Sequence, residues 1–188
     1  MTGRRPVGVV LTGGASTRMG VDKATLTVGD KPMAVRVADV MWEAGCQPVE
    51  CQGGDLAAMA EYGLEAFPDR DPGSGPVAAI RDALVRHDDR DVVVAACDLI
   101  ELDAATVAAL VSAGESDGEP DVVVVSAGGR RHLISWWRSG LGSGLDELVG
   151  AGVTSYRGAL DRFRVLEVEV DPAVVRNVNT PTDLGDVG

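Results

Sequence analysis

Two runs of consecutive apolar residues limit the folds open to this chain. The segments Asp91–Cys97 (DVVVAAC) and Asp121–Ser126 (DVVVVS) hold almost only β-branched and small apolar residues, without alternation. Strands that are apolar on both faces are typical of a parallel sheet covered by helices on both sides. The shorter segments Val7–Thr12 and Pro48–Cys51 bring the number of predicted buried strands to four.

Helices are predicted between these strands. Pro32–Ala44 begins with a proline, which suits the first helical turn, and it stops before Gly45. Gly75–His87 follows the same logic, and Asp103–Ala113 opens with an aspartate suited to the N-cap. Alternating strands and helices predict a three-layer, Rossmann-like α/β fold with helices on both faces of a mostly parallel sheet.

The second half of the chain departs from this alternation. His132–Trp137 is a short, aromatic strand candidate, and Arg164–Asp171 alternates apolar and charged residues as a half-exposed strand would. A mixed sheet with some antiparallel pairing is therefore expected. The glycine-containing segments Gly114–Pro120 and Gly140–Gly144 are interpreted as ordinary loops and not as linkers, so residues 1–188 are expected to form a single domain.

Composition narrows the possible partners. The formal net charge of −12 disfavours nucleic acid and anionic membranes as partners. No apolar stretch approaches the roughly 18–20 residues of a membrane span. The apolar run after Arg4 and Arg5 enters a Gly-Gly turn and is too short for a secretory signal, so it is interpreted as the first strand.

The cysteines and histidines give no metal or disulfide pattern. Three cysteines form no C-x-x-C pair, and His87 and His132 lie far apart. Reduced thiols in a cytoplasmic protein fit best. Cys97 could serve as a nucleophile, but a cysteine in an apolar strand is more often a small core residue.

The strongest local feature follows the first strand, in residues 7–26 (VGVVLTGGASTRMGVDKATL). Gly13 and Gly14 allow backbone N–H groups to approach phosphate oxygens, and Arg18 and Lys23 add positive charge. The segment is neither a Walker A loop nor a G-x-G-x-x-G fingerprint. The residues alone leave two interpretations open: a phosphate-binding loop, or a glycine-rich turn with surface cations.

The pattern L-x-G-G-x-S-x-R-M-G-x-D-K resembles the signature of the molybdenum cofactor guanylyltransferase family. Three further segments resemble that family in the same order: PDRDPGSGPVAAI (68–80), CDL (97–99) and NVNTPTDL (177–184). The resemblance implies a nucleotidyltransferase fold and an enzyme that transfers GMP from GTP to molybdopterin, with Mg²⁺ as cofactor and release of pyrophosphate. It also suggests transient contact with cofactor-handling proteins.

The resemblance assigns roles to particular residues. Asp98 follows a buried strand, where its carboxylate could ligate Mg²⁺ or could merely cap a turn; the resemblance implies the metal ligand. The residues expected to act in catalysis are Arg18, Lys23 and Asp98. Those expected to contact the nucleotide are Leu11, Thr12, Gly13, Gly14, Lys23, Asp69, Gly75 and Asp98. For the loop before Gly75, a turn capped by Asp71 or Ser74 is the alternative.

The acceptor side is less well defined by the sequence. Asn177, Asn179 and His132 are the expected acceptor contacts, with turn-forming asparagines and a solvated basic turn as the alternatives. Thr180 and Asp183 suit a capping box and need no functional explanation. Trp136 and Trp137 are expected to pack in the core.

Some positions depart from the family pattern: Gln52, Val77–Ala79, Ile100 and Leu133. Because of these departures, the sequence does not fix which base the donor nucleotide carries or which molecule is the acceptor. One alternative is the same chemistry with another donor or acceptor, such as CTP with molybdopterin, or a small phosphorylated metabolite or sugar phosphate. Another is a nucleotide-binding module without catalytic activity.

Overall fold

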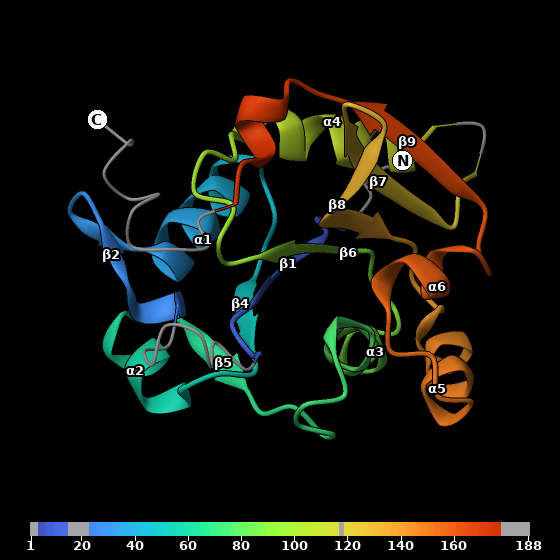
Figure 1. The fold of residues 1–188 in the computed structure, drawn as a ribbon, viewed down its shortest axis with the longest axis horizontal. Helices are drawn as coiled ribbons and strands as arrows, with labels where there is room; N and C mark the ends of the chain where they lie inside the picture. The colour runs from blue at the N-terminus through green and yellow to red at the C-terminus, as the bar shows by residue number, and fades with distance from the viewer. Residues whose placement is uncertain (1–3, 15–22, 117–118, 178–188) are drawn as a thin grey trace.

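A seven-stranded sheet forms the centre of the computed structural model, which describes residues 4–14, 23–116 and 119–177 (Figure 1). Its strand order is β5-β4-β1-β6-β8-β7-β9. Every neighbouring pair is parallel except the two pairs that involve β8. The strands are β1 (Val7–Leu11), β4 (Val49–Gln52), β5 (Glu65–Phe67), β6 (Val92–Ala96), β7 (Val122–Ala127), β8 (Arg130–Trp137) and β9 (Val165–Glu169), and a separate hairpin joins β2 (Thr27–Val28) to β3 (Lys31–Pro32).

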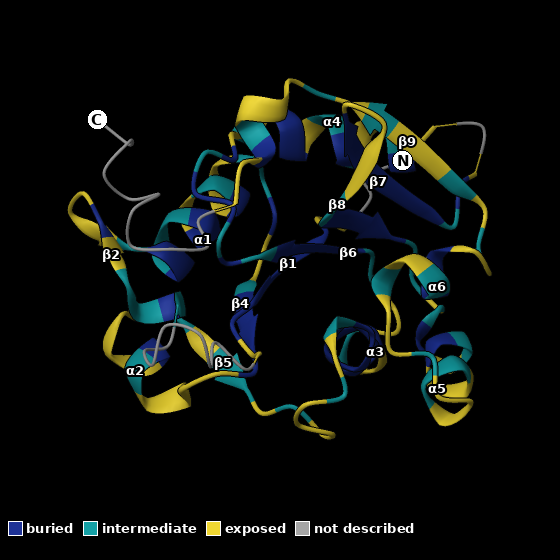
Figure 2. Ribbon diagram, viewed as in Figure 1, coloured by how far each residue is buried: buried dark blue, intermediate teal, exposed yellow. Residues whose placement is uncertain are grey.

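Helices cover both faces of this sheet and give three layers. The helical segments are α1 (Met33–Glu43), α2 (Leu56–Glu61), α3 (Pro76–Arg86), α4 (Ala104–Gly114), α5 (Gly142–Gly150) and α6 (Tyr156–Leu160), with the 3-10 turns η1 (Lys23–Thr25) and η2 (Pro172–Val175). Because side chains alternate along a strand, Val9 and Val10 of β1 enter two different apolar clusters. One cluster packs against α1 and α4, the other against α3, α5 and α6. Figure 2 shows the buried strands between these layers, so the predicted α/β fold is confirmed.

The three predicted helices are present, each with bounds one residue from those expected. Asp103 caps α4 by accepting a hydrogen bond from the Thr106 N–H at 2.7 Å. The chain leaves α1 through Gly45, which has a φ of +94°. In the described ranges, no helix has the length and apolar character needed to cross a bilayer.

One predicted loop was wrong. Gly140–Gly144 was expected to be a connection, but α5 begins at Gly142. A Cβ at Gly142 would lie 3.0 Å from the backbone nitrogen of Val85, so the absence of a side chain lets α5 pack directly on the end of α3. Burial of Leu145 completes that contact. Tertiary packing here overrides the low helix propensity of glycine.

The reversal at β8 produces the expected antiparallel pairing. A two-residue turn, Gly128–Gly129, joins β7 to β8, and both glycines have positive φ, as a type I′ hairpin turn requires. Trp136 and Trp137 are buried, as predicted. Because β8 runs opposite to β6 and β7, its first residues lie at the sheet edge where those two strands end.

Candidate functional site

The carboxyl ends of β1 and β6 lie next to each other in the sheet. Leu11 pairs with Ala96, and the Cys97 N–H donates to the Leu11 carbonyl at 3.3 Å. The chain continues from these ends into Gly13 on one side and Asp98 on the other. Open α/β sheets bind ligands at this edge. The structure therefore brings the glycine loop and the acidic residue together, although more than 80 positions separate them in the sequence.

Lys23 and Asp98 form an ion pair at this edge. Lys23 comes from η1, and its Nζ lies 3.4 Å from Oδ2 of Asp98. Both side chains are largely shielded, at 19% and 15% exposed. The other carboxylate oxygen, Oδ1, is buried and has no hydrogen-bond partner among the described residues. A buried carboxylate oxygen without a partner is costly, so this atom is available to a cation or a donor from a ligand.

Asp98 suits a magnesium ion held jointly by protein and substrate. Within the described ranges there is no group of three or more acidic, histidine or cysteine side chains that could form a closed metal site. Mg²⁺ does not need one, because it usually takes one or two carboxylates and completes its shell with phosphate oxygens and water. The unpartnered oxygen of Asp98 is compatible with such a ligand set.

A second carboxylate, that of Asp69, lies over two glycine backbones. A Cβ built on Gly13 or on Gly53 would lie 2.6 Å from Oδ2 of Asp69 in either case. Neither position can carry a side chain without moving this carboxylate. Thr12 ties the same loops together, because its hydroxyl donates to the Gly53 carbonyl at 2.7 Å. Thr12 is itself buried, and the contact that the structure shows for its side chain is with the neighbouring loop.

Gln52 is a site residue that the sequence interpretation did not include among the functional positions. Its buried amide nitrogen donates to the Pro68 carbonyl at 3.0 Å and to Oδ1 of Asp69 at 3.3 Å. Its amide oxygen accepts from Arg86 at 2.8 Å, and this contact fixes which end of the amide faces Asp69. The available signal was that Gln52, at the end of a strand, departs from the family pattern.

The environment of Asp69 alters its acidity. Burial raises the pKa of this carboxyl, and the nearby charge of Asp82 raises it further, while the hydrogen bond from Gln52 acts in the opposite direction. The loop that follows Asp69 leads to Gly75, the N-cap of α3, which has a φ of +83°. A Cβ there would lie 2.8 Å from the Thr154 carbonyl oxygen, so both conformation and packing require glycine.

The alternative interpretation of this loop expected a turn capped by Asp71 or Ser74, and the loop does turn between these two residues. No side chain caps α3. The Asp71 carboxylate accepts from Arg81 instead, at 2.7 Å, and at Ser74 the backbone N–H donates to the Asp71 carbonyl at 3.1 Å. Whether Gly75 and Asp69 contact a nucleotide stays a prediction.

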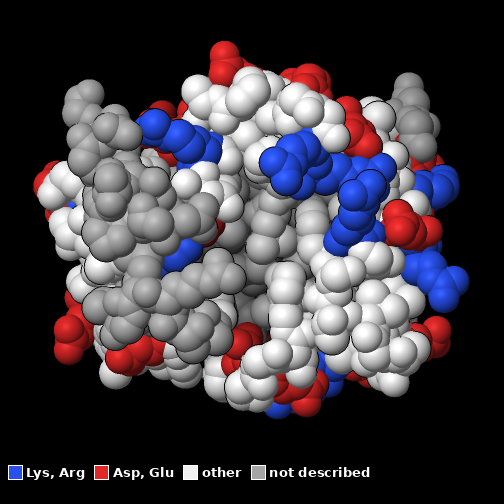
Figure 3. Space-filling view, viewed as in Figure 1, with Lys and Arg blue, Asp and Glu red and all other residues white. Residues whose placement is uncertain are grey.

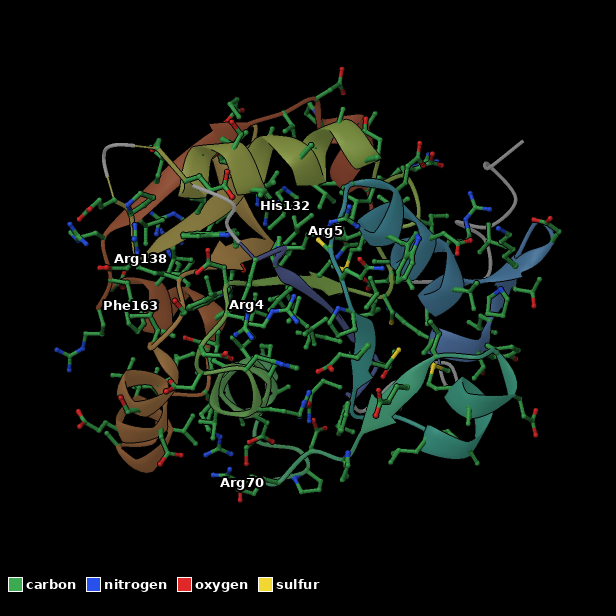
Figure 4. The ribbon with its side chains drawn as sticks, turned by 180° about the vertical axis from the view of Figure 1, so that it is seen from behind. Arg4, Arg5, Arg70, His132, Arg138 and Phe163 are labelled. Atoms are coloured by element: carbon green, nitrogen blue, oxygen red, sulfur yellow. The ribbon has the colours of Figure 1, made fainter. Side chains whose placement is uncertain are left out.

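His132, one of the expected acceptor residues, lies on the opposite side of the sheet edge from Asp69. His132 is half-buried in β8, two residues before Ile134, the partner of Ala95 in β6. It therefore lies close to the chain that leads to Asp98. Burial lowers the pKa of His132, and the charge of Arg130 lowers it further. Figure 4 shows His132 well apart from Arg70, which belongs to the Asp69 loop.

The basic residues beside His132 belong to a strand and not to a turn, and Arg130 and Arg131 are exposed, so whether they contact an acceptor stays a prediction. Arg130 and Arg131 open β8, and Arg131 pairs with Glu167 of β9 at 2.8 Å. In Figure 3 the middle of the molecular face is hollowed, and basic side chains gather beside the hollow over the β7–β8 hairpin. Asn177 is exposed. The guanidinium of its neighbour Arg176 lies 3.3 Å from the carboxylate of Glu101, and Glu101 follows Asp98 by three residues in the sequence.

Some predicted site residues have simpler outcomes. Leu11 is buried at the end of β1, while Gly14 is exposed with a φ of +133°, and no described residue lies within 4 Å of where its Cβ would be. Cys97, considered as a nucleophile, is buried. Arg18 and Asn179 lie outside the described residues, so their predicted roles stay predictions.

Comparison with known proteins matches this geometry to a family. The model of the MobA-like NTP transferase domain matches residues 8–165. The chain belongs to the MobA-like NTP transferase family. It is accordingly a nucleotidyltransferase. The matched range includes the glycine loop, Lys23, the Asp69 loop, Asp98 and β8.

Individual relatives cover nearly the whole MobA-like chain. A probable molybdenum cofactor guanylyltransferase of Mycobacterium marinum is 33% identical over 94% of this chain and 90% of its own length. A relative of the same description from Mycobacterium avium is 31% identical, over 94% and 92%. The crystal structure of molybdopterin-guanine dinucleotide biosynthesis protein A from Archaeoglobus fulgidus superposes with a TM-score of 0.80 at 22% identity, over 96% of this chain and 95% of that one. The structural likeness supports the fold.

Proposed function

We propose that this protein transfers GMP from GTP to molybdopterin in a Mg²⁺-dependent reaction that releases pyrophosphate. The observation that carries the proposal is the Lys23–Asp98 pair, which presents a buried, unpartnered carboxylate oxygen beside the glycine loop. The names of the relatives, probable molybdenum cofactor guanylyltransferases, support the choice of donor and acceptor.

The proposed chemistry needs little covalent work from the protein. An oxygen of the acceptor phosphate forms a bond to the α-phosphorus of GTP, the bond from the α-phosphorus to the bridging oxygen breaks, and pyrophosphate leaves. The attacking phosphate is already ionised near pH 7, so no general base is required. Positioning and charge neutralisation then supply most of the rate enhancement.

Each part of the site has a proposed task in this reaction. Mg²⁺, held by Asp98 and the phosphates, would supply charge neutralisation at the α-phosphate. Lys23 and Arg18, with the backbone N–H groups of the loop at Gly13 and Gly14, would hold the leaving pyrophosphate. Leu11 and Thr12 would fix the start of that loop at the end of β1.

The nucleoside and the acceptor would bind on different sides of these phosphates. We assign the base and ribose to the loop from Asp69 to Gly75, at the N-terminus of α3. We assign the acceptor to the side of His132, Asn177 and Asn179. The basic side chains at the β7–β8 hairpin support this assignment, because they would attract the acceptor phosphate in a protein whose net charge is −12 (Figure 3).

We further propose that residues 1–188 form one nucleotidyltransferase domain that works in the cytoplasm. Its three cysteines are buried and are not joined in disulfides, which suits a reducing compartment. GTP and molybdopterin would be its small-molecule substrates, and proteins that deliver or collect the cofactor would make transient contacts. Nucleic acid and membranes are not proposed partners.

A panel of triphosphates tests the donor. Thermal unfolding with Mg²⁺ and each of GTP, CTP, ATP, UTP and dTTP should show a shift with GTP alone, of roughly 5–10 °C at about 100 times the Kd. Pyrophosphate release in the presence of molybdopterin then tests turnover. A shift with CTP in place of GTP would contradict the guanylyl assignment. Binding of GTP without pyrophosphate release would contradict catalysis and favour a nucleotide-binding module.

A further inference from the structure

Four charged side chains form a cluster behind the Asp69 loop, and two of them, Arg81 and Asp82, are buried. Arg81, in the second turn of α3, has a side chain only 4% exposed. It donates hydrogen bonds to three carboxylates, each at 2.7 Å: Asp82 beside it in α3, Asp71 in the loop before α3, and Asp146 in α5. Of these carboxylates, Asp82 is also buried, at 6% exposed.

The cluster forms hydrogen bonds with two successive residues of the loop, Arg70 and Asp71. Oδ2 of Asp82 accepts a hydrogen bond from the backbone N–H of Arg70 at 2.8 Å, and Arg81 holds the carboxylate of Asp71. The guanidinium of Arg70 also lies 3.7 Å from both Asp82 and Asp146. The residue directly before this anchored pair is Asp69, whose carboxylate lies against the backbones at Gly13 and Gly53.

Stability alone gives a weak reason for such an arrangement. Removing Arg81 and Asp82 from water carries a desolvation cost that their mutual attraction offsets only when the geometry is very good, and apolar replacements of such pairs are often equally stable. The arrangement does fix a geometry, because the planar Arg81 guanidinium joins the loop at Asp71 to α3 and α5, and Asp82 holds the loop a second time at the Arg70 N–H.

We propose that Arg81 and Asp82 are positioning residues for the nucleoside part of the substrate, and that they act by holding Arg70 and Asp71 so that Asp69 stays beside the glycine loop. This inference rests on the proposed function, in which the Asp69 loop receives the base and ribose. The inference assigns the two parts of the nucleotide to different elements. The cluster positions the loop that binds the nucleoside, and the glycine loop binds the phosphates.

Asp82→Ala tests the separation through two ligands. Calorimetric titration with Mg²⁺ should show the Kd for GTP rising at least about tenfold, while the Kd for inorganic tripolyphosphate stays within about twofold. In turnover the KM for GTP should rise with kcat little changed, because positioning is lost and the phosphate machinery is not. Asp82→Asn keeps an oxygen that can accept from the Arg70 N–H and should recover most of the GTP affinity. Glu147→Ala, an exposed residue next to Asp146, is the matched control.

Asp71→Ala provides a second test with little risk to folding, because that side chain is 47% exposed. It should weaken GTP binding in the same direction, by about threefold, and leave tripolyphosphate binding unchanged. Equal losses for GTP and tripolyphosphate, or unchanged GTP binding in both alanine variants, would overturn the inference. If the unaltered protein binds tripolyphosphate but no nucleoside triphosphate, the proposed function itself fails, and this result is distinct from the other two.

Discussion

Lys23 Nζ lies 3.4 Å from Oδ2 of Asp98, across 75 positions of sequence. The lysine occupies one carboxylate oxygen and leaves Oδ1 buried and without a partner among the residues described. One carboxylate can thus be held in place by a fixed positive charge while its second oxygen remains available to a divalent cation.

Asp98→Asn should separate folding from catalysis. The amide keeps the shape of the carboxylate, and Lys23 retains enough exposure to be hydrated, so circular dichroism and the unfolding midpoint should change little. Mg²⁺-dependent pyrophosphate release should fall by at least about 10²-fold, as when a preorganised charge-stabilising group is lost. Glu101→Gln, three residues away, is the control and should retain activity. Near-normal turnover by the Asp98 variant would remove this residue from the metal site.

Asp69→Asn should increase the stability of the fold and weaken nucleotide binding. The fold raises the pKa of Asp69, mainly through burial, so the ionised carboxylate destabilises the folded state at neutral pH, and this penalty disappears as the pH falls through the folded pKa. The variant should therefore exceed the unaltered protein in free energy of unfolding at about pH 7, and the difference should shrink towards about pH 4, near the unfolded pKa. Urea denaturation at the two pH values measures this. A variant less stable than the parent at pH 7 would contradict the prediction. The variant should also bind GTP more weakly than the parent at both pH values.

His132→Gln should affect the acceptor and not the donor. The KM for molybdopterin should rise several-fold, while the KM for GTP stays within about twofold, since His132 lies on the side of the sheet edge away from the Asp69 loop. The fold lowers the pKa of His132, so its contribution to stability is present above the unfolded pKa of about 6.5 and is lost as the pH falls below it. The glutamine variant should consequently lose less stability than the parent between about pH 7 and pH 5. Equal changes in both KM values would argue against an acceptor role.

Gly114→Ala should destabilise the protein through overpacking. A Cβ at this position would lie 2.4 Å from the Trp136 indole, which is buried and has no room to retreat. Small-to-large changes in packed cores cost about 1–3 kcal/mol. Gly150→Ala is a matched control in another helix, since a Cβ there would meet none of the described residues within 4 Å. It should stabilise by up to roughly 1 kcal/mol through helix propensity. Thermal unfolding of both variants measures this. A midpoint that does not fall for Gly114→Ala, or that falls for Gly150→Ala, would contradict the prediction.

The parts of the fold that follow from local patterns were predictable. The apolar runs around Val94 and Val124 identify buried strands, and a residue directly after such a strand, like Asp98, must lie at the sheet edge. Gln52 carries no comparable signal, because its importance comes from meeting Asp69 and Arg86 after three segments have packed together. Helix α5 was missed for the same reason, since its glycine-rich start is helical only because α3 accepts it closely.

The two sides of the proposed site differ in how they are encoded. The nucleotide side is assembled from separate stretches of chain after β1, β4, β5 and β6, joined by contacts such as those of Asp69 with Gly13 and Gly53. On the proposed acceptor side, His132 belongs to an uninterrupted hairpin that turns at Gly128 and Gly129, and nothing in the described chain lies within 4 Å of where a Cβ on either glycine would be. In the proposed site, the hairpin that carries His132 can therefore be lengthened or exchanged as one continuous segment, whereas the nucleotide side can be changed only by coordinated substitutions at several distant positions of the sequence.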